Sequence, residues 1–225
     1  TDWIEDIMLR TQPLEKYDQW TSGELKFDSD EVRNAFDVMG NIWFNEDYVY
    51  GGTTSILTVN FGDSPTPLFE DPPACWMHRQ ASFIPNFFPE GTEMGVDIDY
   101  FYLPPIDSAY GKPVLVSGNL VSLANDTPAG REVIKFMTTA ESVKAEVEAG
   151  NAISPHTGAS LDWYPSDVQR GYAEILAGAD AFRFDGSDLM PGEVGTGTFW
   201  TGVVDWVSGE DLDGVLQAID ASWPE

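Results

Sequence analysis

The sequence predicts an α/β fold, because helical and strand patterns alternate along its 225 residues and the helical patterns predominate. Hydrophobic residues make up 42% of the chain, which is enough for a packed core. The length suits one large domain or two small ones. Aromatic residues make up 13%, an excess over the needs of burial that is typical of proteins whose rings line a ligand site.

Two helices are predicted in the first part of the chain. Apolar residues recur at helical spacing over 2–10, and a longer pattern covers 29–45. We expect Asp28 to cap the second helix, with Glu31 three positions later completing a capping-box pattern. The glycines at 51 and 52 and the polar run to 55 predict a break. The apolar stripe of the longer helix is expected to consist of Val32, Phe36, Met39 and Trp43.

Three strands are predicted in the middle of the chain. The apolar run 74–78 is typical of a short buried strand, and 95–103 alternates before ending at two prolines. The third strand is expected at 114–123, where it needs partners for its backbone hydrogen bonds.

Helices account for most of the remaining sequence. Thr127 and Pro128 predict a helix start, with Val133, Ile134 and Met137 on its buried face. Further helices are expected at 140–149, which closes at a glycine, and at 165–177, 193–207 and 210–222.

The charge is strongly negative, with 11 Lys and Arg against 38 Asp and Glu and a formal net charge of −27. Such a field repels phosphate backbones and anionic lipid, so neither a nucleic acid nor membrane insertion is expected. The charge fits a solvated acidic surface, and a salt-rich habitat is the alternative reading. Cys75 is the single cysteine, so an internal disulfide is excluded.

Catalytic and metal-binding motifs are weak. His78 and His156 are far apart and lack neighbouring ligands, which argues against zinc. The run from Asp185 to Asp188 resembles part of a calcium loop, but the downstream ligand spacing is absent and a tight turn is favoured. Paired carboxylates for a glycosidase cannot be singled out among 38 acidic residues. We therefore predict a chain with no catalytic residue, no metal and no cofactor.

Three segments in order carry a family resemblance. They are ACWMHRQASFIPNFF at 74–88, GKPVLVSGNLVSLANDTPAGREVIK at 111–135 and AFRFDGSDLMPGEVGTGTFW at 181–200. Together with the closing helix they resemble family 1 extracellular solute-binding proteins of bacterial ABC importers, the group that includes maltose- and α-glucoside-binding proteins.

This resemblance implies a type II periplasmic-binding-protein-like fold with two lobes. On that basis 1–103 and 158–225 belong to the second lobe, and 104–157 is a returning segment of the first lobe. The family's first lobe begins with a long segment that has no counterpart here. The resemblance thus predicts the C-terminal part of such a protein, whose missing N-terminal half lies on the same chain or on a separate one.

The implied function is capture of a mono- or oligosaccharide, such as an α-glucoside, in a cleft between hinged lobes. The closed form would deliver the sugar to ABC transporter permease subunits. The protein would act in the periplasm or outside the cell, secreted or lipid-anchored. Two alternatives stay open: a glycoside-active enzyme with an acidic, aromatic-lined cleft, and a non-enzymatic adhesion or scaffold domain.

The resemblance also indicates site residues. Trp200 is the first choice for a ring that stacks on the sugar, against the alternative of a core tryptophan. Phe83 is the second choice, equally consistent with the core, and Arg183 could pair with Asp188 instead of meeting a ligand. The complete predicted set is Trp200, His78, Arg79, Gln80, Phe83, Ser117, Gly118, Asn119, Arg183 and Asp188.

Overall fold

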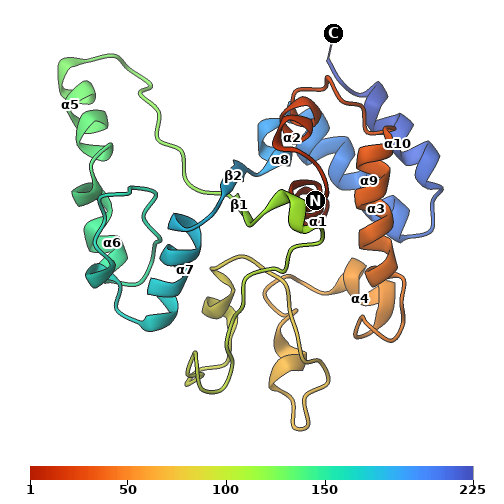
Figure 1. Cartoon of the computed structure of the whole chain (residues 1–225), viewed down its shortest axis with the longest axis horizontal. Coiled ribbons are helices and arrows are strands. Elements are labelled where there is room, and N and C mark those ends of the chain that lie inside the picture. The colour runs from red at the N-terminus through yellow and green to blue at the C-terminus, as the bar shows by residue number, and fades with distance from the viewer. Residues whose placement is uncertain (225) are drawn as a thin grey trace. The chain divides into compact units, whose positions relative to one another are not determined.

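The computed structural model describes residues 1–224. It contains both helices and strands and is rich in helix (Figure 1). The chain divides into two compact units, each built from separate stretches of sequence. Unit 1 consists of Thr1–Gly91, Pro104–Val116 and Asp180–Glu225, and unit 2 consists of Thr92–Leu103 and Ser117–Ala179. These bounds differ from the lobe boundaries predicted at 103 and 157, and the assignment of lobes stays a prediction.

Unit 1 is a helical body with a small parallel sheet. Its helices are α1 (Asp2–Thr11), α2 (Leu14–Thr21), α3 (Asp30–Trp43), α4 (Gly52–Thr58), α8 (Gly186–Leu189), α9 (Trp200–Val207) and α10 (Leu212–Ala221). A π-helical stretch, Glu193–Phe199, leads directly into α9. The sheet pairs β1 (Pro113–Val116) with β2 (Ala181–Phe184) in parallel, with Pro113 opposite Ala181. Helix α1 packs against both β1 and α3.

Aromatic residues form the centre of unit 1. Trp20, Phe27 and Phe199 are fully buried and meet edge to face, with ring centroids 5.0 to 5.5 Å apart. Phe36 of α3 contacts Trp206 of α9 at 5.1 Å, so these two helices are joined by ring packing. Burial of this apolar and aromatic surface is the main stabilising contribution to the unit.

Unit 2 is smaller and less buried. It contains α5 (Pro128–Met137), a 3₁₀ turn (Ala140–Val143) followed by α6 (Lys144–Glu148), and α7 (Asp167–Ala177). Tyr100 packs edge to face on Tyr172 of α7, with centroids 4.5 Å apart. The expected helix start is confirmed, since the Thr127 hydroxyl accepts the Gly130 N–H at 3.0 Å.

The prediction that one face of α5 is buried is wrong in this chain. Val133 is 57% exposed, Ile134 is only half-buried, and Met137 is also exposed. The amphipathic pattern that formed the helix is present, but most of its apolar side is exposed in unit 2.

Most predicted helices are confirmed, including those around 2–10, 29–45, 165–177, 193–207 and 210–222. The cap of α3 differs, because the Ser29 hydroxyl accepts the Val32 N–H at 3.4 Å while the Asp28 carboxylate pairs with Arg33. Helix α2 was not predicted, and α4 begins at Gly52, where a break was expected.

The strand predictions hold least well. Only the first part of 114–123 is a strand, and 74–78 is an exposed loop whose Ala74 and Cys75 N–H groups both bond to the Pro67 carbonyl. At 95–103 a tight turn bonds the Gly95 N–H to the Ile98 carbonyl at 2.7 Å. An alternating pattern becomes a strand only where a neighbouring strand accepts its hydrogen bonds.

Candidate ligand site

Arg79, one of the predicted site residues, contacts several residues of α1. Its guanidinium pairs with Asp6, lies 3.6 Å from the Asp2 carboxylate and donates to the Asp2 carbonyl at 3.2 Å. It also lies over the Trp3 ring, 5.6 Å from the centroid. A loop arginine is thus fixed on the first turns of α1 by charge and by a cation–π contact.

The spacing of residues along α1 positions the side chains that surround Arg79. Asp6 and Arg10 are four residues apart, and their side chains meet at 2.6 Å while almost fully buried. Asp6 therefore has a cation on each side, Arg10 and Arg79. Trp3 meets Trp43 of α3 edge to face at 6.2 Å, which holds its ring beside the arginine. Two rings and a guanidinium next to a carboxylate are the groups that bind the C–H faces and hydroxyls of sugars.

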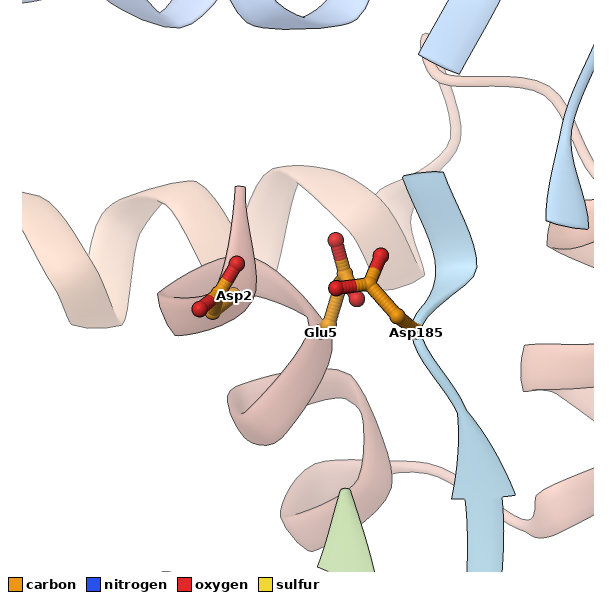
Figure 2. A group of neighbouring side chains, drawn as sticks. All are labelled: Asp2, Glu5 and Asp185. Atoms are coloured by element: carbon orange, nitrogen blue, oxygen red, sulfur yellow. The ribbon is translucent and has the colours of Figure 1, made fainter. Parts of the chain in front are cut away.

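Three carboxylates gather where α1 meets the turn after β2. Asp2, Glu5 and Asp185 each offer an oxygen, and these oxygens lie within 4.8 Å of one another (Figure 2). Glu5 is fully buried and accepts the Gly186 N–H at 2.7 Å. Burial, and next the nearby Asp185 charge, raise the pKa of Glu5 to about 8. The group has the oxygen donors that a hard metal ion prefers.

The Asp185 turn that was predicted from sequence is confirmed. The Asp185 carboxylate accepts the Asp188 N–H at 3.2 Å and the Ser187 hydroxyl at 2.7 Å, and so caps α8. Asp188 itself is exposed, and partial desolvation together with the Asp185 and Asp2 charges raises its pKa. That Asp188 accepts hydrogen bonds from the hydroxyls of a bound sugar stays a prediction.

Arg183 is not the partner of Asp188. It lies on β2 and forms a two-pronged ion pair with Asp18 of α2, at 2.6 and 2.9 Å. The prediction that Arg183 could pair with Asp188 is therefore wrong, because the strand directs the arginine towards α2. A ligand contact through Arg183 would have to compete with Asp18.

Trp200 is exposed although its neighbour is in the core. Phe199 is fully buried, whereas 56% of the Trp200 side chain is accessible to solvent. The two residues are the last of the π-helical stretch and the first of α9, so they point to different sides of the same helix. Trp200 is therefore not part of the core of unit 1, and its role as a ring for a ligand stays a prediction.

The other predicted residues of unit 1 have local partners. The His78 ring lies 3.4 Å from the Ser64 hydroxyl, and burial, then the Arg79 charge, lower its pKa. Gln80 accepts the Ala81 N–H at 2.9 Å. Phe83 is 44% exposed and belongs to a small ring cluster. The rings that contact Phe83 are those of Phe61 and Phe87.

Ser117, Gly118 and Asn119 belong to unit 2 and are exposed directly after β1. The other seven predicted residues belong to unit 1. Sequence reasoning missed Asp2, Trp3 and Glu5, which lie beside Arg79 or Asp185. The only local signal was the spacing of Asp2 and Glu5, which places both in the first turn of α1.

Known proteins resemble this chain along its whole length. The osmoprotective compounds-binding protein of Synechocystis sp. is 45% identical over 224 residues, which is 100% of this chain and 53% of that protein. The alpha-glucosides-binding periplasmic protein of Rhizobium meliloti is 44% identical over 227 residues, which is 99% of this chain and 49% of that protein. The chain spans about half the length of the curated relatives it matches.

No family model and no solved structure matches the chain. Among residues 1–224, no helix combines the length and the apolar character needed to cross a membrane. The relatives confirm the resemblance found in the three sequence segments: the chain is a homologue of extracellular solute-binding proteins.

Proposed function

We propose that this chain is part of a periplasmic or extracellular binding protein that captures a sugar or a related small solute and delivers it to an ABC importer. The observation that carries the proposal is the match of the whole chain, at 44% identity, to an alpha-glucosides-binding periplasmic protein. The second relative is named for osmoprotective compounds, which widens the class of ligand to small polar solutes. Both names describe binders, which favours a non-enzyme.

The exposed apolar face of unit 2 supports the proposal that more of the protein packs here. Phe136 is 55% exposed and lies on α5 with Val133 and Met137, and Leu120 of the same unit is 84% exposed. Full burial of such a side chain gains about 1.5–3 kcal/mol, and most of these side chains have only part of that gain in this unit. The chain spans about half the length of its relatives. We infer that the other half supplies the cover, as the first lobe of the predicted two-lobed fold.

The proposed ligand contacts combine an accessible ring with fixed polar groups. Trp200 would stack on the C–H face of the solute, and Arg79, already oriented by Asp6 and Trp3, would donate to its hydroxyls. The remaining proposed contacts are His78, Gln80, Phe83, Ser117, Gly118, Asn119, Arg183 and Asp188. Hinge closure around the solute would be the state that the importer recognises.

The direct test is a tryptophan fluorescence titration of protein that includes the other half. The panel contains α- and β-linked mono- and disaccharides and osmoprotective polyols. We expect a saturable change with at least one solute, lost in Trp200→Ala. It should be kept in Tyr48→Ala, which removes a ring that is 67% exposed and outside the proposed site.

Two results would contradict this proposal. A folded protein that responds to no solute in the panel would refute capture of a sugar or polyol. Release of product from an aryl glycoside would favour the glycoside-active enzyme, which needs a carboxyl with a raised pKa facing its cleft.

A further inference from the structure

One buried oxygen of unit 1 lacks a partner. Glu5 is 0% exposed, and its Oε2 accepts the Gly186 N–H at 2.7 Å. Within residues 1–224, its other oxygen, Oε1, is sealed from solvent and has no hydrogen-bond partner. A buried carboxylate oxygen without a partner is costly, so a group that satisfies it is expected.

Two carboxylates, those of Asp185 and Asp2, lie near this side chain together with the Thr1 amino group. Figure 2 shows the carboxyl groups of Glu5 and Asp185 facing one another, with Asp2 one turn earlier on the same helix. The nearest guanidinium is that of Arg79, which reaches Asp2 at 3.6 Å but forms its tighter pair with Asp6. Arg79 therefore does little to offset the repulsion between Glu5 and Asp185, and the Thr1 amino group is the cation that acts directly on Glu5.

Hydroxyl oxygens complete the cluster. The Thr1 hydroxyl lies 3.4 Å from the Asp2 carboxylate and 3.4 Å from the Ser187 hydroxyl. The Ser187 hydroxyl in turn donates to Asp185 at 2.7 Å. Carboxylate and hydroxyl oxygens, without a nitrogen or sulfur ligand, suit a hard cation.

The spacing of the carboxylate oxygens is compatible with calcium. All three ligand oxygens lie within 4.8 Å of one another. Oxygens on opposite sides of a Ca²⁺ ion lie about 4.6–5.2 Å apart, because each bond is about 2.3–2.6 Å long. Asp2 and Asp185 are only half-buried, so water can fill the remaining coordination positions from their side.

We propose that Asp2, Glu5 and Asp185 bind a Ca²⁺ ion that joins the first turn of α1 to the turn before α8. The ion would occupy the space beside Glu5 Oε1 and offset the repulsion between the three carboxylates. Two segments at opposite ends of the sequence would be held together by it. The site is structural, and it borders the proposed solute contacts, because Asp2 meets Arg79 and Asp185 accepts the Asp188 N–H.

The test uses the purified protein after treatment with a chelator and exchange into metal-free buffer. Tb³⁺ is the probe, because the indole of Trp3 lies on the same helical turn and can sensitise Tb³⁺ luminescence. Ca²⁺ is then added in competition, and the melting temperature is recorded with and without it. We expect one saturable Tb³⁺ site that Ca²⁺ empties, and a higher melting temperature with Ca²⁺.

Two variants remove the site while keeping the fold. Glu5→Gln keeps an acceptor for the Gly186 N–H, and Asp185→Asn keeps a good helix cap. Each should weaken Ca²⁺ binding by at least about tenfold, the lower end of the cost of losing an outer-shell partner. The melting temperature of Glu5→Gln should also not rise when Ca²⁺ is added, since a ligand of the ion is lost. Asp37→Asn, which changes an exposed carboxylate on α3, is the matched control.

Two outcomes would overturn the proposal. Equal Tb³⁺ and Ca²⁺ binding by wild type, Glu5→Gln and Asp37→Asn would mean that the ions bind to the acidic surface in general. Absence of a saturable site in a folded wild-type protein would mean that a proton, not a metal ion, separates Glu5 from Asp185.

Discussion

Truncation of Phe199 to alanine is expected to destabilise unit 1 by about 4 kcal/mol, within the range of about 3–5 kcal/mol for buried Phe→Ala changes. The ring is fully buried and meets Trp20 at 5.5 Å and Phe27 at 5.0 Å, both edge to face. Each such pair contributes about 0.5–1.5 kcal/mol beyond the buried area, and both are lost. A domain is typically stable by about 5–15 kcal/mol, so this single change removes a large share.

Urea unfolding followed by tryptophan fluorescence measures this effect, since Trp20 lies in the same ring cluster. With a denaturant slope of about 2 kcal/mol/M, the midpoint should fall by about 2 M. Phe199→Leu, which refills much of the space, should recover more than half of the loss.

Trp200→Ala is the control for this experiment, because it alters the next residue of the same helix. Its side chain is 56% exposed, and its removal should cost less than about 1 kcal/mol. If the two alanine variants shifted the midpoint equally, the distinction between a core ring and an available ring would be refuted.

Three further predictions follow from individual contacts. Burial lowers the pKa of His78, so the folded state disfavours protonation of its ring. The contribution of His78 to the free energy of unfolding should be fully present above the unfolded pKa of about 6.5 and should fall as the pH drops below that value. The fall measured between about pH 7.5 and 5.5 should be smaller in His78→Gln, and an unchanged slope would exclude His78 as its source. Gly195→Ala should destabilise unit 1 by about 1–3 kcal/mol or more, because a Cβ would lie 2.7 Å from the Ser187 carbonyl carbon; wild-type stability in a thermal melt would contradict this packing. Arg183→Met should cost only about 0.2–1 kcal/mol, since its pair with Asp18 is solvated; a loss that persists in high salt would show a role beyond this pair.

The helices of this protein were determined by its local sequence. The periodic apolar residues and the Thr127 cap act within a few positions of the chain, and α5 begins where that cap predicts. Helix α7 forms within the predicted range 165–177, and the structure shows Ser166 as its cap. Strands 74–78 and 95–103 were predicted from equally clear local patterns and did not form. Their hydrogen bonds would require another strand, and pairing of that kind is not encoded by the residues of the strand itself.

The ordered resemblance of three segments identified the class of protein, because it drew on residue identities along the whole chain. The arrangement of the site was decided only by the tertiary structure. Sequence alone did not show that Arg79 would lie between Asp6 and Trp3. Nor did it show that Glu5 would meet Gly186, a residue 181 positions away. Such contacts arise when α1 packs against the turn after β2, because burial and charge depend on which surfaces the fold brings together.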